Sequence, residues 1–145
     1  MEYTKGRIGR VFVLKFSNDD IIIDEIKRFA KKEKVKTATI TCIGALKDGC
    51  IVTGPKKAVI PPDANWTAFK DAWETIGIGT IFAGKDSPQV HLHVSMGKKN
   101  KTLTGCVRKS EKVFCVIEAI VCEIIGTKAS KGIDPKTGLN MLKVR

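Results

Sequence analysis

The sequence predicts an α+β domain, built on a mostly antiparallel β-sheet with one main α-helix. Two observations carry this prediction. Six or so segments are rich in β-branched and aromatic residues, as strands are. Only one segment, residues 22–30, repeats apolar residues at the three- and four-residue spacing of a helix that buries one face. A chain of 145 residues has the usual size of one domain. We therefore expect a single domain over 1–145, with its core over about 8–125 and a polar tail over 126–145.

The first strand and the helix follow one another directly. Residues 8–16 are dominated by β-branched and aromatic side chains and should form the strand. Residues 17–20 supply N-cap candidates and negative charge for a helix start, and the helix should run to about Lys34. Its predicted buried stripe consists of Ile22, Ile23, Ile26, Phe29 and Ala30.

The rest of the chain predicts strands separated by turns. Asp48-Gly49 is a hairpin turn signal, and residues 55–66 hold three of the five prolines, which favours a loop. Residues 98–101 should form the turn of a second hairpin, and Asp134-Pro135 a turn in the tail. The strands are expected at 36–46, 50–52, 69–82, 90–96, 102–108 and 113–125.

The composition excludes several classes of protein. No segment approaches the 18 consecutive apolar residues of a membrane span, and residues 1–10 lack the apolar stretch of a secretory signal. The five cysteines form no C-x-x-C pair, and in a chain without a signal they are expected to be reduced thiols. A cytoplasmic location is therefore expected.

The chain is strongly basic. It has 26 Lys and Arg against 15 Asp and Glu, a net charge of +11 and a pI near 9.6. This balance makes DNA or another polyanion a candidate partner, although lysine-rich surfaces also serve solubility and ion pairing. Pairing with the helix dipole explains the basic residues near the predicted helix end better than a phosphate-binding face does. These residues are Lys27, Arg28, Lys31, Lys32 and Lys34.

The only two histidines lie together as His91-Leu92-His93. Alternate residues of a strand share a face, so both imidazoles should point to one side and Leu92 to the other. Such a pair is either a solvent-facing pair or part of a metal site.

The hairpin around residues 98–101 can add a third ligand. If its loop has an even number of residues, His93 faces Cys106 and His91 faces Arg108, with Cβ atoms about 4.5–5.5 Å apart. An odd loop would move Cys106 to the other face. Two imidazoles and a thiolate suit zinc best, with iron or copper possible, and three protein ligands leave a fourth position open.

Two further residues are candidates for chemistry. Arg108 could bind an anion beside the metal, although a plain surface arginine is the simpler interpretation. Glu118 lies in the apolar run 113–121, where a carboxylate costs free energy unless it is paired or protonated. We expect Glu118 to form a buried ion pair, to act as a catalytic general acid or base with a raised pKa, or to serve as an additional partner at the metal site.

These residues together resemble the plants-and-prokaryotes conserved (PPC) domain family. The resemblance covers roughly residues 8–125 and rests on the opening strand and helix and on short motifs. Family members typically carry a third histidine where this chain has Cys106. The motifs are Ile43-Gly44-Ala45, Gly79-Thr80-Ile81, His91-Leu92-His93, Thr104-Gly105-Cys106 and Glu118, with a tail segment at 134–139.

The resemblance implies an α+β domain that assembles as a homotrimer, with the histidine cluster near a subunit interface. The fold is also similar to that of acetolactate decarboxylase, which holds zinc with three histidines, and to related zinc ester hydrolases. Plant members carry AT-hook motifs and act in DNA-associated assemblies. This chain has no Arg-Gly-Arg-Pro hook, so hook-type DNA binding is not expected.

Two functions follow as hypotheses. The first is a small metal-binding PPC protein, with zinc at His91, His93 and Cys106 and a DNA-associated or regulatory role. The second is a zinc-dependent hydrolase or lyase of a small ester or keto acid, in which Glu118 handles protons and Arg108 holds a carboxylate. A metal that only stabilises the trimer is a third interpretation.

Overall fold

The protein is described by a computed structural model that covers residues 1–108 and 110–144. Eight strands and one helix are defined in these residues, and the α+β class predicted from the sequence is confirmed. In chain order the elements are β1 (Arg7–Ser17), α1 (Ile22–Lys32), β2 (Thr37–Pro55), β3 (Ala64–Ala83), β4 (Pro88–Lys98), β5 (Lys101–Val107), β6 (Lys112–Ile125), β7 (Ser130–Ile133) and β8 (Asn140–Lys143).

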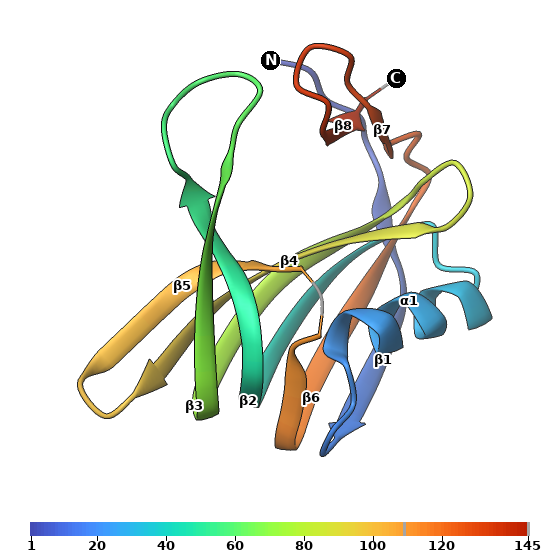
Figure 1. The fold of residues 1–145 in the computed structure, drawn as a ribbon. Helices are drawn as coiled ribbons and strands as arrows, with labels where there is room; N and C mark the ends of the chain where they lie inside the picture. Colours follow the sequence, from blue (N-terminus) through green and yellow to red (C-terminus); the bar gives the residue numbers. More distant parts are fainter. Residues whose placement is uncertain (109, 145) are drawn as a thin grey trace.

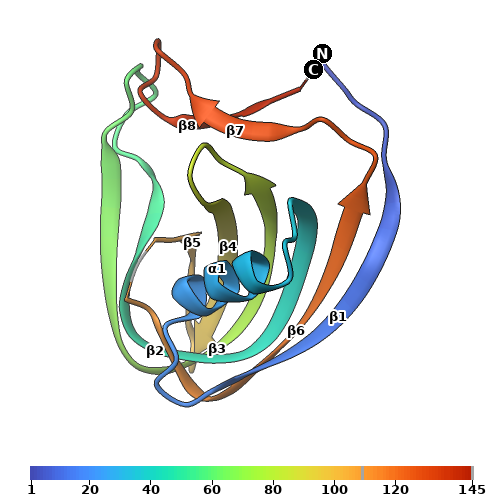
Figure 2. The same cartoon turned by 90° about the vertical axis from the view of Figure 1, so that its right-hand side faces the viewer.

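Six strands form one antiparallel sheet in the order β1-β6-β2-β3-β4-β5, and β2 also pairs with β5. The sheet curves around helix α1, which lies against its inner face (Figure 2). Strands β2 and β3 are the longest, with 19 and 20 residues, and their hairpin projects beyond the other strands (Figure 1). Strands β7 and β8 form a separate two-stranded sheet within the segment predicted as a polar tail.

Helix α1 buries the stripe that the sequence predicts. Ile22 and Ile26 are fully buried, and Phe29 packs against the core from its margin. The helix contacts β4, whose Leu92 and Met96 are also fully buried. Burying side chains of this size stabilises the fold by about 1.5–3 kcal/mol each. Within the described residues, no helix has the length and apolar composition needed to cross a bilayer.

The start of the helix differs from the prediction. Its N-cap is Ile21, whose side chain cannot accept a hydrogen bond, rather than one of the polar residues 17–20. The Ser17 backbone N–H donates to Asp20 Oδ2 at 2.7 Å, so this carboxylate closes the turn before the helix instead of capping it. The helix ends at Lys32, two residues earlier than expected, and Lys34 follows with φ 56°.

The predicted hairpin turn at Asp48-Gly49 is wrong, because β2 continues through this point to Pro55. The register against β3 shifts here, because Asp48 of β2, with φ 46°, lies opposite two residues of β3, Lys70 and Asp71, so the irregularity is a β-bulge whose extra residue belongs to β3. Bulges bend a strand and increase its twist. The bend accompanies a change of partner, since the second half of β2 reaches β5 and Val52 pairs with Cys106.

The second predicted hairpin is present between β4 and β5. Lys98 pairs with Lys101, so Lys99-Asn100 forms a two-residue connection, the even loop that the metal hypothesis needs. The proline-rich loop is shorter than predicted, because β3 already begins at Ala64. It spans residues 56–63.

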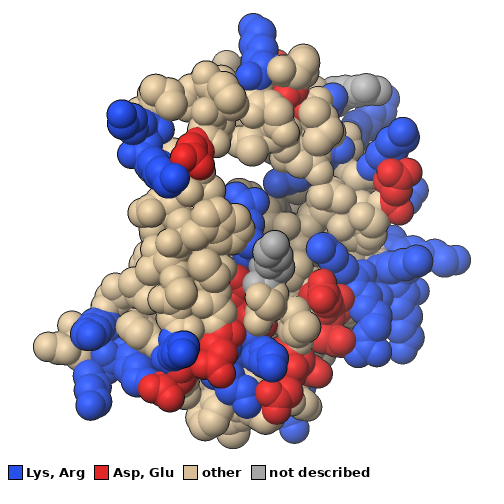
Figure 3. Space-filling view, viewed as in Figure 1, with Lys and Arg blue, Asp and Glu red and all other residues tan. Residues whose placement is uncertain are grey.

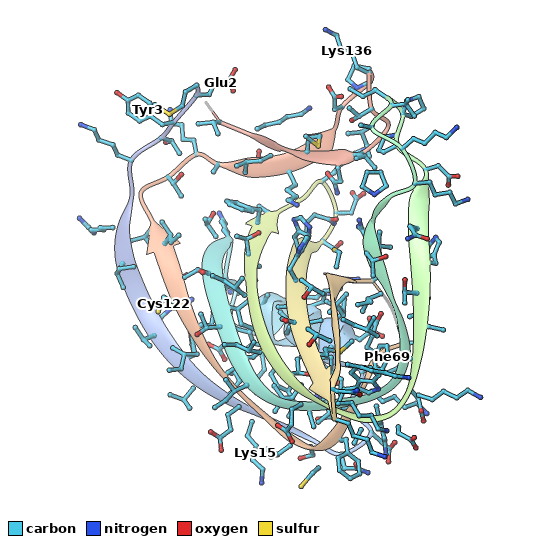
Figure 4. All side chains as sticks on the ribbon, turned by 90° about the vertical axis from the view of Figure 1, so that its left-hand side faces the viewer. Glu2, Tyr3, Lys15, Phe69, Cys122 and Lys136 are labelled. Carbon is cyan, nitrogen blue, oxygen red and sulfur yellow. The ribbon has the colours of Figure 1, made fainter. Side chains whose placement is uncertain are left out.

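The outer face of the sheet, which is the face turned away from α1, carries exposed apolar side chains. Figure 4 views the sheet from this side, with α1 behind the strands. Val13 is 82% exposed, and Ile76 and Ile78 are each 64% exposed. Large exposed apolar patches mark interaction surfaces in soluble proteins. The core therefore lies between the sheet and α1, and a second apolar surface remains uncovered.

Candidate metal centre

Strand β4 places His91 and His93 on the outer face, while Leu92 between them is buried on the inner face. The two rings lie edge to face with centroids 4.8 Å apart, and their Nε2 atoms are 3.0 Å apart. Two imidazole nitrogens on one tetrahedral zinc ion lie about 3.3 Å apart, given Zn–N bonds of about 2.0–2.1 Å. The pair is therefore close to a ligating geometry.

The β4–β5 register brings Cys106 to this pair. His93 lies directly opposite Cys106, as the even hairpin connection requires. One possible ligand atom from each of His91, His93 and Cys106 lies within 4.8 Å of the others. Cys106 is buried, at 3% exposure, while both imidazoles are exposed to solvent. The structure thus brings together the three residues that the sequence singled out.

The electrostatic surroundings keep His91 in the form that binds metals. His91 is exposed at the surface, but the protein removes part of the water around its ring; this partial burial, followed by the charges of Lys131, His93 and Arg108, lowers the pKa of His91 to about 4. The ring is therefore neutral at pH 7, with a lone pair available for a metal. Burial raises the pKa of the Cys106 thiol, and the charges of Arg108 and Lys131 oppose that rise. A metal cation deprotonates a thiol that coordinates it, so the two imidazoles and this thiol fit zinc.

Arg108 lies directly after Val107, the last residue of β5. The predicted pairing of Arg108 with His91 is not formed, because the ladder with β4 ends at Val107. The Arg108 backbone N–H instead donates to Oε1 of the buried Glu111 at 3.2 Å. The Arg108 side chain is exposed, and its charge still reaches His91, whose pKa it helps to lower.

Glu118 is exposed, which contradicts the expectation of a buried carboxylate. It lies on the outer face of β6, where its ladder neighbours are Lys15 of β1 and Ile43 of β2. The apolar residues around Glu118 suggested that both faces of this strand are buried. In the structure α1 covers only the inner face of the sheet, so side chains on the outer face remain exposed. The buried carboxylate of this strand is Glu123, at 9% exposure.

A hollow of about 660 Å³ on the outer face joins two of the predicted site residues. His93 and Glu118 both line it, so the hollow reaches one candidate ligand and one candidate proton-transfer group. Most of its lining is apolar. The large apolar residues are Val13, Ile43, Ile76, Ile78 and Ile120.

The sequence reasoning missed Lys131, which lies in β7. This lysine is half-buried, and its positive charge acts on both His91 and Cys106. Strands of four residues are too short for alternation to identify them. The sequence feature that could have indicated this hairpin is the turn at Asp134. There Thr137 donates two hydrogen bonds to the Asp134 carboxylate and closes the connection between β7 and β8.

Comparison with known proteins places the fold. No curated protein sequence matches the chain. A metal-containing protein from Archaeoglobus fulgidus has a similar structure, with a TM-score of 0.86 at 19% identity over 99% of each chain. A plant- and prokaryote-conserved (PPC) protein from Pyrococcus horikoshii gives 0.84 at 26% identity, over 100% of this chain and 99% of that one. A candidate DNA-binding protein from Ralstonia eutropha gives 0.76 at 15% identity, over 92% and 90%.

The sequence also matches a family directly. Residues 3–125 match the family described as the Plants and Prokaryotes Conserved (PCC) domain, which is the family abbreviated PPC above. The matched segment covers most of the chain and includes His91, His93 and Cys106. The chain therefore belongs to the Plants and Prokaryotes Conserved (PCC) domain family.

Proposed function

We propose that this protein is a metal-binding PCC-domain protein that holds one zinc ion at His91, His93 and Cys106. The observation that carries the proposal is the convergence of these three residues, whose possible ligand atoms lie within 4.8 Å of one another. Two imidazoles and a thiolate suit zinc better than calcium or magnesium, which take oxygen ligands. The metal-containing neighbour from Archaeoglobus fulgidus supports the proposal.

The test is metal analysis of protein purified without added metal. We expect about one zinc per chain, because three protein ligands make one site, and a loss of at least about tenfold in Cys106→Ser and His93→Ala. Cys115→Ser is the matched control, because it removes an exposed thiol outside the cluster and should keep the zinc. A wild-type protein without transition metal, or full zinc in both ligand variants, would overturn the proposal.

We further propose that the protein acts in the cytoplasm in a DNA-associated or regulatory role. Its five cysteines are free thiols, which suits a reducing compartment. Exposed cations gather around the C-terminal end of α1, seen at the right of Figure 3. Their position suits the helix dipole, and the same exposed side chains could also contact phosphates without reading bases. The candidate DNA-binding neighbour from Ralstonia eutropha supports this role. The cations are Lys27, Arg28, Lys31, Lys32 and Lys34.

DNA binding is tested by fluorescence anisotropy with two duplexes of unrelated sequence at several salt concentrations. We expect similar affinity for both duplexes and a steep loss with salt. The double variant Lys31→Gln/Lys32→Gln should reduce the slope of log K against log salt by up to about 1.8, at about 0.9 per phosphate contact. The control Lys56→Gln/Lys57→Gln changes two exposed lysines of the β2–β3 loop and should keep the slope. No binding at low salt would rule out this role.

A homotrimer is the assembly that we propose for this chain. The outer face presents a patch of exposed aliphatic side chains that a single chain leaves uncovered. Subunit contacts that buried this patch would remove it from water at about 25 cal/mol per Å². The patch consists of Val11, Val13, Ile43, Ile76, Ile78 and Ile120.

A second candidate function is a zinc-dependent hydrolase or lyase of a small ester or keto acid. The observation that favours it is the shared hollow, in which His93 and Glu118 line one apolar cavity. When bound, zinc would polarise a carbonyl group or activate a water molecule. Glu118 would take up or deliver a proton, and Arg108 would hold a substrate carboxylate. Turnover of ester and 2-keto-acid panels should fall at least about 100-fold in His93→Ala, and equal activity in both proteins would exclude zinc catalysis.

A further inference from the structure

The β7–β8 hairpin is anchored beside the candidate metal ligands. The Asn140 side chain of β8 donates to Gln89 Oε1 at 2.7 Å. Gln89 lies two residues before His91 in β4, so the two side chains share the outer face. Strand β7 also contacts β3, which pairs with β4 in the sheet. The hairpin, drawn in red at the upper end of the sheet in Figure 2, therefore lies over the end of β4 that carries His91.

This anchoring puts Lys131 of β7 next to the cluster. Its side chain is half-buried, and its charge contributes to the lowered pKa of His91 and opposes the raised pKa of Cys106. Burial lowers the pKa of Lys131 itself; the charge of Cys106 opposes this shift, and the charge of Arg108 adds to it as a smaller cause. Strand β7, distant in the sequence, thus brings one cation to the three possible metal ligands that the β4–β5 hairpin carries.

Within residues 1–108 and 110–144, neither cation near the cluster has a carboxylate in ion-pair contact. Among the described residues, no carboxylate lies within 4.0 Å of the Lys131 ammonium or the Arg108 guanidinium. A half-buried ammonium without a partner costs free energy, because burial removes part of its hydration. A divalent metal beside Lys131 and Arg108 would add to the positive charge. The nearby negative groups would be the Cys106 thiolate and the Glu111 carboxylate, whose charge also acts on Cys106.

We propose that Lys131, together with Arg108, makes the open position of the metal site selective for a small oxyanion, with a carboxylate or phosphate group. One oxygen of the anion would take the fourth metal position, and the remaining oxygens would face the two cations. The inference rests on the metal site proposed above and adds the class of ligand and a specificity-determining residue. Charge-assisted hydrogen bonds to such an anion are the interactions that Lys and Arg form best.

The test uses protein loaded with Co²⁺, whose visible absorption reports the ligands of the metal. Acetate and inorganic phosphate are titrated separately, and acetamide serves as the uncharged analogue of acetate. We expect both anions to change the cobalt bands with saturation and acetamide to leave them unchanged. The tighter of the two anions identifies the chemical source of the oxyanion.

Three variants locate the effect. Lys131→Met should weaken anion binding at least about tenfold, which is the loss of one charge-assisted hydrogen bond, and Lys131→Arg should restore most of it. Lys128→Met changes an exposed lysine before β7 and should bind like wild type. Circular dichroism spectra of the variants check the fold.

Two failures are distinguishable. If wild-type protein binds no cobalt, the metal site is wrong and this inference falls with it. If cobalt binds but neither anion changes the bands, or if Lys131→Met binds anions as tightly as wild type, the anion site alone is overturned.

Discussion

His93 faces Cys106 across the β4–β5 hairpin, and this pairing gives the chain three candidate metal ligands instead of two. The two histidines share a face of β4 because they are two residues apart on one strand, so their placement does not depend on how β4 pairs with its neighbours. The cysteine joins them because Lys99-Asn100 is a two-residue connection. One residue more or less in this loop would turn Cys106 to the other face of β5.

Cys106→His should therefore keep the metal, because an imidazole at this position also faces His93 and also binds zinc. In Co²⁺-loaded protein, the wild type should show a thiolate-to-cobalt charge-transfer band. The variant should lose that band while it keeps about one metal per chain. Absorption spectroscopy combined with metal analysis measures both quantities, with Cys115→Ser as the control that keeps the band. A band that persists in Cys106→His would show that this thiol is not a ligand.

The candidate ligands could be predicted from the sequence because their placement depends on local rules. Strand alternation puts His91 and His93 on one face, and an even loop puts Cys106 opposite. The same rules failed at Asp48-Gly49, where a turn signal marks a bulge. A dipeptide that tolerates positive φ is compatible with a hairpin turn and with a β-bulge. The pairing of β2 with β3 and β5, which are distant in the sequence, determines which of the two forms.

The surroundings of the site could not be predicted, because they depend on contacts between distant elements. Glu118 and Glu123 both lie in an apolar strand, and which of them is buried depends on which face α1 covers. Lys131 reaches the cluster through a short hairpin that a side-chain hydrogen bond ties to β4 and that also contacts β3. The burial of Glu123 rather than Glu118 and the approach of Lys131 to the cluster both depend on contacts between elements, so no residue pattern within one segment of the sequence predicts them.

Gly44 is required by the close approach of β2 to β6. It has φ 142°, and an added Cβ would lie 2.3 Å from the Val116 carbonyl oxygen and 2.7 Å from Ile117 Cα. Gly44→Ala should lower the free energy of unfolding by about 3 kcal/mol, because backbone atoms must move in addition to the strain at positive φ. Gly126→Ala, with φ 80° and open space around it, should cost about 1 kcal/mol. Urea denaturation compares the two variants, and equal losses would contradict this explanation.

The stability of the fold should depend on pH through Glu123. Arg10 donates to both of its carboxylate oxygens, at 2.8 and 3.0 Å, and this hydrogen bonding lowers the pKa of Glu123 below the ordinary value of 4.5. A lowered pKa in the folded state stabilises the protein above the unfolded pKa, and this contribution is lost as the pH falls through the lowered pKa. The gap in unfolding free energy between wild type and Glu123→Gln should thus be constant above about pH 5.5 and shrink below about pH 4.5.

Urea denaturation over this pH range measures that gap. The control is Glu25→Gln, which removes the partner of Arg28 in an exposed pair on α1 and should change stability little at any pH. A gap for Glu123→Gln that does not vary with pH would show that the pair with Arg10 does not contribute in this way.

The outer face should hold the proposed trimer together. Ile78 lies near the middle of the sheet on β3 and is 64% exposed in the single chain, so a lysine there would place a charge inside the subunit contact. Wild-type protein should show a mass of about 48 kDa by light scattering after gel filtration, three times the 15.9 kDa of one chain. Ile78→Lys should shift it to about 16 kDa, while Ile60→Lys, an exposed apolar position in the β2–β3 loop, should leave it unchanged. A wild-type monomer at micromolar concentration would refute the trimer, and a trimeric Ile78→Lys would move the contact to another surface.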